Sequence, residues 1–140
     1  MITGEIMKAS SLCFRAAVLF VIAGMVWGII MAVSENHAAM PAHAHLNLLG
    51  WVSLFLFGIY YRLHPALETA RTALLQVWAW IVATVVLATG VGLIFSGYPA
   101  ADPLAVVGSL LALAAMILFG WVVFRAESLG VRQRAAIAAE

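Results

Sequence analysis

Four long stretches of the sequence contain no Lys, Arg, Asp or Glu, and they limit the possible folds more than any other feature. They cover residues 16–34, 36–61, 72–101 and 103–124. Each could cross about 30 Å of hydrocarbon as an α-helix that rises about 1.5 Å per residue. Only 9% of the residues are charged, whereas roughly a quarter are in soluble domains. The sequence predicts an all-α integral membrane four-helix bundle, a single transmembrane domain over residues 1–140 with helices at about 12–34, 43–63, 72–96 and 104–126.

The basic residues all fall on one side of this predicted topology. They are Lys8, Arg15, Arg62, Arg71, Arg125, Arg132 and Arg134. The loops at 35–42 and 97–103 contain Glu35 and Asp102 but no Lys or Arg. Because cytoplasmic loops retain Lys and Arg, we expect both termini in the cytoplasm and these two loops in the periplasm of a bacterial inner membrane protein. A net charge of +1 gives no reason to expect a nucleic-acid partner, so none is expected, and the expected surroundings are the lipid bilayer.

The first span is expected to remain in the mature protein. Its uncharged core, residues 16–34, is longer than a signal-peptide h-region of roughly 7 to 15 residues. Gly24 and Gly28 form a GxxxG step in it, which predicts close packing against another helix. The only cysteine, Cys13, excludes an internal disulfide and a metal site built from cysteines. We expect it to be a small buried residue.

Three histidines cluster where the second span begins. His37, His43 and His45 fall within nine residues. An ionisable group in or near a bilayer indicates a functional site, and neutral imidazole binds haem iron, copper and zinc. On an α-helix His43 and His45 would be about 200° apart, so we expect them to serve two different sites on opposite flanks. If the segment is extended instead, both could join His37 and Met40 around a copper ion.

The second span also carries a resemblance to a known family. Residues 43–51 read HAHLNLLGW, and residues 57–65 read FGIYYRLHP. The segment resembles the tenth helix of the main subunit of haem-copper oxidases. That helix opens with His-x-His, has a glycine five residues after the second histidine, ends in an aromatic pair and stops at proline. The resemblance implies that His43 is the proximal ligand of a high-spin haem and that His45 is an axial ligand of a low-spin haem.

The resemblance also gives meaning to the number of spans. The family's main subunit has twelve helices in three groups of four, and its second, sixth and tenth helices bear the metal ligands. The histidines here lie on the second of four predicted spans. The resemblance therefore implies a homotrimer that imitates the twelve-helix subunit.

The sequence departs from the family in ways that bear on activity. Leu49, not a tyrosine, follows His45 by four residues, and no two histidines are adjacent. The third and fourth spans contain no Lys, Glu or Asp to carry protons. Oxygen reduction coupled to proton pumping is therefore not expected.

The expected function is that of a membrane b-type cytochrome. Haem b bound by His43 and His45 would serve electron transfer with a redox partner, or gas binding, and any enzymatic activity would be that of an oxidoreductase. Asn47 is expected to bond a ligand imidazole or a propionate, and Trp51 to line the haem. Two alternatives stay open: a copper or zinc site at the periplasmic face, and a cofactor-free assembly subunit. His64, near the other face, is expected to be an interfacial residue without a ligand role.

Overall fold

The chain is helical throughout the part that the structure describes. The computed structural model describes the backbone of residues 7–137 and the side chains of residues 7–127. Four helices in this part are long and apolar enough to cross a membrane: Ala9–Ser34, Met40–Leu63, Arg71–Phe95 and Pro99–Glu127. Among the described residues there is no strand. The expected all-α fold with four membrane-spanning segments is confirmed at this level, which supports an integral membrane protein.

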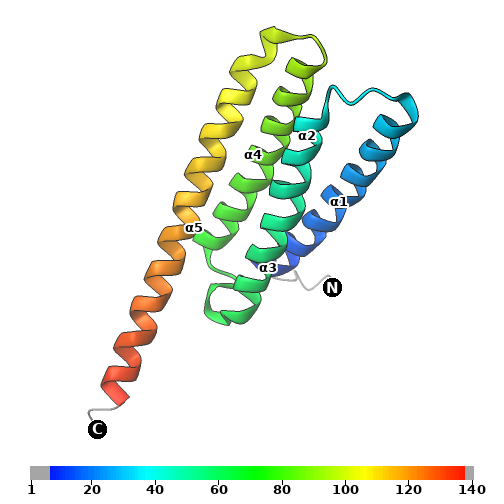
Figure 1. Cartoon of the computed structure of the whole chain (residues 1–140). Helices are drawn as coiled ribbons and strands as arrows, with labels where there is room; N and C mark the ends of the chain where they lie inside the picture. Colours follow the sequence, from blue (N-terminus) through cyan, green and yellow to red (C-terminus); the bar gives the residue numbers. More distant parts are fainter. Residues whose placement is uncertain (1–6, 138–140) are drawn as a thin grey trace, which may run out of the picture.

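The spans stand side by side in sequence order. The elements are α1 (Ala9–Ser34), α2 (Met40–His45), the π-helix η1 (Leu46–Ser53), α3 (Leu54–Leu63), the 3-10 turn η2 (Pro65–Leu67), α4 (Arg71–Phe95), the 3-10 turn η3 (Pro99–Ala101) and α5 (Asp102–Ile137). Together α2, η1 and α3 form the second span, which lies between α1 and α4, and α5 packs on the far side of α4 (Figure 1).

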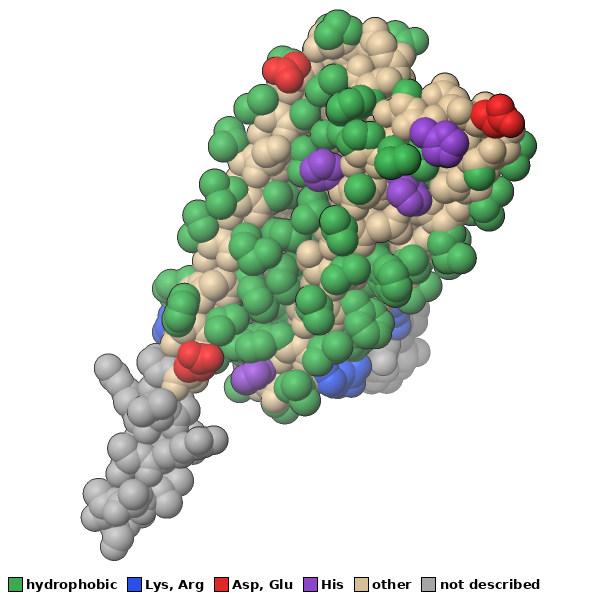
Figure 2. All heavy atoms as spheres, viewed as in Figure 1, with side chains coloured by type: hydrophobic (Ala, Val, Ile, Leu, Met, Phe, Trp, Pro, Cys, Tyr) green, Lys and Arg blue, Asp and Glu red, His purple; other side chains and the backbone are tan. Residues whose placement is uncertain are grey.

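The two ends of the bundle differ in chemistry. The start of α1 and the end of α5 lie at the same end (Figure 1). The Lys and Arg side chains gather toward this end, and histidines gather toward the other (Figure 2). We call them the basic end and the histidine end. The segregation of charge predicted from the sequence is therefore present in the fold.

Three helix boundaries differ from the predicted ones by three residues or more. The first helix begins at Ala9, and the second span begins at Met40 because Pro41 fits in the first turn, where a missing N–H costs nothing. The last helix continues past residue 126 to Ile137. Arg132 and Arg134 lie in this continuation, and their side chains are outside the described residues.

The loop between α3 and α4 fastens the start of α1. Glu68 is buried, and its carboxylate accepts hydrogen bonds from the Ser10 hydroxyl at 2.7 and 2.8 Å and from the Ser10 amide at 3.2 Å. The Glu68 carbonyl accepts a further bond from the Ala9 amide at 2.8 Å. A carboxylate at a helix N-terminus satisfies amides that have no partner within the helix and interacts favourably with the helix dipole. These bonds explain why α1 already begins at Ala9.

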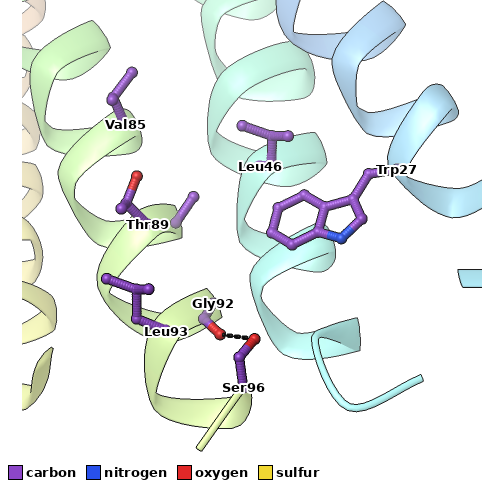
Figure 3. A pocket seen from close by; sticks show the side chains of 8 residues that line it. Trp27, Leu46, Val85, Thr89, Gly92, Leu93 and Ser96 are labelled. Atoms are coloured by element: carbon purple, nitrogen blue, oxygen red, sulfur yellow. Dashed lines mark hydrogen bonds between the residues drawn. The ribbon is translucent and has the colours of Figure 1, made fainter. Parts of the chain in front are cut away.

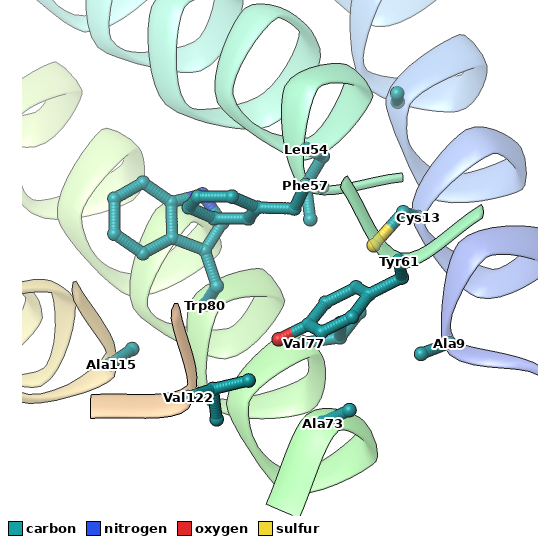
Figure 4. Packing of buried hydrophobic residues seen from close by; sticks show 11 residues of the cluster. Ala9, Cys13, Leu54, Phe57, Tyr61, Ala73, Val77, Trp80, Ala115 and Val122 are labelled. Carbon is teal, nitrogen blue, oxygen red and sulfur yellow. The ribbon is translucent and has the colours of Figure 1, made fainter. Parts of the chain in front are cut away.

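The apolar core lies in the basic half of the bundle. Phe57 of α3 packs edge-on against Trp80 of α4 and tilted against Phe119 of α5, with ring centroids 5.1 and 4.3 Å apart. The hydroxyl of the buried Tyr61 donates to Gln76 Oε1 at 2.9 Å. The buried cluster consists of Ala9, Cys13, Ala17, Leu54, Phe57, Tyr61, Ala73, Val77, Trp80, Ala115 and Val122 (Figure 4). Cys13 is buried in this cluster, as expected.

Candidate functional site

The second span changes its helical geometry directly after His45. Residues Leu46–Ser53 form a π-helix, which is wider than an α-helix. Side chains add bonds to its carbonyls: the Ser53 hydroxyl donates to Leu48 O at 2.9 Å, and the indole N–H of Trp80 donates to Leu49 O at 3.0 Å. π-helical turns occur frequently at functional sites. No sequence pattern predicted this one, and one of these two bonds comes from another helix, α4.

His43 is turned toward α1 and fits against the GxxxG step. A Cβ at Gly28 would lie 3.2 Å from His43 Cε1, and a Cβ at Gly24 would lie 2.8 Å from Asn47 Cγ. Real Cβ atoms are almost never that close to another side chain, so Gly24 is required for Asn47 to lie where it does. The predicted close approach at this step is confirmed, and polar side chains fill it.

Asn47 fixes the orientation of the His43 ring. Its Nδ2 donates to the His43 carbonyl at 2.8 Å and lies 3.2 Å from His43 Nε2. Because a carbonyl can only accept, the Asn47 atom that faces it must be the amide nitrogen and not the amide oxygen. This nitrogen also donates to Nε2 of His43, which is then the acceptor of the second bond. The ring proton must therefore be on Nδ1, which is buried without a hydrogen-bond partner among the described residues. The predicted bond between Asn47 and an imidazole is present, but it occupies the nitrogen that His43 would offer to iron.

His45 has the opposite arrangement. Its Nδ1 lies 2.7 Å from the carbonyl oxygen of Pro41, one turn earlier. The carbonyl can only accept, so Nδ1 carries a proton, and in the neutral imidazole Nε2 then has a free lone pair. Among the described residues nothing hydrogen-bonds to Nε2, and the side chain is half-buried. His43 and His45 belong to the same helix, so their separation of about 200° holds and they cannot share one metal.

The other residues predicted around the histidines are not brought to His45. His37 lies in the exposed turn before α2, and Met40 is the exposed first residue of α2. Trp51 is 42% exposed and lines a shallow cavity of about 200 Å³ with Val52, Phe55 and Leu56. Within the described part, no three His, Cys, Asp or Glu side chains form a group that could hold a metal ion. The copper alternative required an extended segment, and this segment is helical from Met40 onward.

A cavity of about 370 Å³ opens between α1, η1 and α4 in the histidine half. Gly92 forms part of its wall and lies close to Trp27, since a Cβ at Gly92 would be 3.3 Å from the Trp27 ring. A second cavity of about 340 Å³ toward the histidine end shares Trp27 and Ser96 with it. The first cavity is lined by Trp27, Leu46, Val85, Ala88, Thr89, Gly92, Leu93 and Ser96 (Figure 3). These residues are mainly apolar, and no described histidine lines either cavity.

His64 lies near the basic end, away from the other histidines. Its Nδ1 donates to the Tyr60 carbonyl at 2.7 Å, and its ring stacks on Tyr60 with centroids 4.2 Å apart. These contacts account for its position as a packed histidine at the end of α3.

Comparison of the chain with protein-family models, with curated proteins and with solved structures found no match.

Proposed function

We propose that the chain is a membrane haem-binding protein, a b-type cytochrome in which His45 is the principal axial ligand. The proposal rests on the 2.7 Å bond from His45 Nδ1–H to the Pro41 carbonyl. His64 makes the same kind of bond to the Tyr60 carbonyl, but its ring is stacked on Tyr60, whereas among the described residues no ring contact covers His45. Metal-bound histidines commonly donate their second ring N–H to a carbonyl, which fixes the tautomer and makes the ligating nitrogen more basic. His45 thus has the protonation state and the orientation that a haem ligand needs, in a chain whose helices suit a bilayer.

The residues fit a haem with one ready ligand and one that needs a rearrangement. Nε2 of His45 can hold iron without breaking a bond, whereas Nε2 of His43 accepts from Asn47. His43 can become a ligand if the Asn47 amide keeps only its bond to the His43 carbonyl and the ring turns away from Gly28. When bound, haem b supplies a one-electron couple, with two imidazoles favouring electron transfer and one leaving a position for a gas.

We propose that a neighbouring copy of the chain supplies the second ligand to each haem iron. Because His43 and His45 diverge, one chain cannot place both on the same iron, and a homotrimer would let each haem lie between two protomers. The resemblance of residues 43–65 to the oxidase helix supports this number of copies. We further propose that the basic end faces the cytoplasm and the histidine end faces the periplasm of a bacterial inner membrane, since Lys and Arg concentrate on the cytoplasmic side.

The proposal is tested by measuring haem per protein in single histidine variants. The chain is purified in mild detergent, supplied with haem b, and assayed by the pyridine haemochrome method. His45→Ala is expected to lose most of the haem, and His43→Ala to retain part of it with a changed spin state. His37→Ala and His64→Ala are matched controls that should bind as the parent chain does, and far-UV circular dichroism checks that every variant stays helical.

Two results would overturn the proposal. A folded His45→Ala variant that holds as much haem as the parent would exclude His45 as the principal ligand. Stoichiometric copper or zinc by elemental analysis, lost in His37→Ala, would favour the metal alternative instead. Native mass spectrometry tests the oligomer separately, with a mass of three chains expected and a haem-loaded single chain contradicting the shared site.

A further inference from the structure

Another cavity lies at the basic end, between α5, the start of α4 and the turn η2. It has a volume of about 260 Å³ and is lined by Leu67, Thr72, Trp121, Val122, Arg125 and Ala126. Most of these side chains are apolar, and the lining carries one charge, on Arg125. The guanidinium carbon of Arg125 lies 5.0 Å from the centroid of the Trp121 ring, which places the charge over an aromatic face.

The position of this cavity determines what can reach it. It lies where α5 and α4 approach the basic end, and Arg125 is two residues from the end of the Pro99–Glu127 span. In a bilayer crossed by this span, the apolar part of the cavity would face acyl chains and Arg125 would lie near headgroup level. Trp side chains favour this level because the ring is apolar and the indole N–H is polar. A ligand that fits must therefore be anionic at one end and apolar at the other.

We propose that this cavity binds an anionic phospholipid. The Arg125 guanidinium and the Thr72 hydroxyl hold the headgroup phosphate, and one acyl chain lies along Trp121, Val122 and Leu67. A guanidinium matches phosphate oxygens with two parallel hydrogen bonds, which a zwitterionic lipid with its own ammonium group uses less well. This site is independent of the proposed haem, since it lies at the opposite end of the bundle from His45.

Native mass spectrometry in detergent can compare dioleoyl phosphatidylglycerol with dioleoyl phosphatidylcholine, which differ only in the headgroup. The parent chain is expected to bind phosphatidylglycerol about tenfold more tightly, as one charge-assisted interaction allows. Arg125→Gln should remove most of this preference, and Thr72→Val part of it. Arg15→Gln is the matched control, because it removes a charge from the same end of the bundle but from α1, and it should leave the preference nearly unchanged.

Equal binding of the two lipids by the parent chain would overturn the proposal. An equal loss in Arg125→Gln and Arg15→Gln would do the same, since it would show a general attraction between charges rather than a site. Ala126→Phe provides a second test if Arg125→Gln loses helicity, because Ala126 lines the cavity but is only half-buried. It fills the apolar part of the cavity and should weaken both lipids, and unchanged binding of both would refute the assigned acyl-chain position.

Discussion

Gly24→Ala is expected to destabilise the bundle, although alanine is a better helix former than glycine. A Cβ at residue 24 would lie 2.7 Å from Asn47 Nδ2 and 2.8 Å from Asn47 Cγ, so the Asn47 side chain has to move. When it moves, it gives up the bond to the His43 carbonyl and the contact with His43 Nε2. The substitution therefore acts on the histidine site through a neighbouring helix.

The magnitude follows from three contributions. Overpacking a close contact costs about 1–3 kcal/mol, and losing the Asn47 hydrogen bond costs a further ~0.5–1.5 kcal/mol. Alanine recovers about 1 kcal/mol of helix propensity. The net loss in the free energy of unfolding should be about 0.5–3.5 kcal/mol.

Two other glycines provide matched controls. A Cβ at Gly28 would lie 3.2 Å from His43 Cε1, a contact that a small shift of the ring relieves, so Gly28→Ala should be within about 1 kcal/mol of the parent. Gly120 has nothing within 4 Å of its would-be Cβ, so Gly120→Ala should be neutral or stabilising.

The assay is unfolding by sodium dodecyl sulfate in mild detergent, followed by far-UV circular dichroism. The double variant with Asn47→Ala isolates the contact, because Gly24→Ala should cost little once the obstructing side chain is gone. A steric conflict between residue 24 and Asn47 is refuted if Gly24→Ala is as stable as Gly120→Ala. It is also refuted if Gly24→Ala lowers the free energy of unfolding by the same amount in the Asn47→Ala background.

Two further substitutions test contacts that hold the spans together. Trp80→Phe keeps the aromatic packing but removes the donor to Leu49 O, and it should lower the free energy of unfolding by about 1–3 kcal/mol in the same assay; a Trp80→Phe variant with parent stability would mean that the π-helix does not depend on this bond. Glu68→Gln should destabilise the start of α1 by about 1–2 kcal/mol, because the amide accepts from Ser10 less strongly than the carboxylate. Hydrogen exchange at the Ala9 and Ser10 amides should then speed up, and unchanged exchange would show that the Glu68 carboxylate does not hold the start of α1.

The spans were predictable because hydrophobic length and the placement of charge are local properties. Four uncharged stretches became four membrane-spanning helices, and Pro41 shifted one start by a few residues because the first helical turn tolerates proline. The 200° separation of His43 and His45 could also be predicted, since it needs only that the segment is helical.

The details of the site could not be predicted because they depend on partners from other spans. The π-helix takes a donor from Trp80, and the His43 ring is held where Gly24 and Gly28 leave space for it and Asn47. The GxxxG step was visible in the sequence, but nothing in it indicated which side chains would occupy the space. Trp51 was expected to line the haem, and this stays a prediction; its cavity with Val52, Phe55 and Leu56 could not be read from the sequence.

Haem binding by His45 can be tested with a reduced-minus-oxidised optical spectrum. The purified chain supplied with haem b should give a Soret band and the α-band of a b-type cytochrome, and His45→Ala should lose both while remaining helical. A parent chain without a Soret band after haem addition would contradict haem binding. A folded His45→Ala variant with an unchanged spectrum would contradict His45 as the ligand.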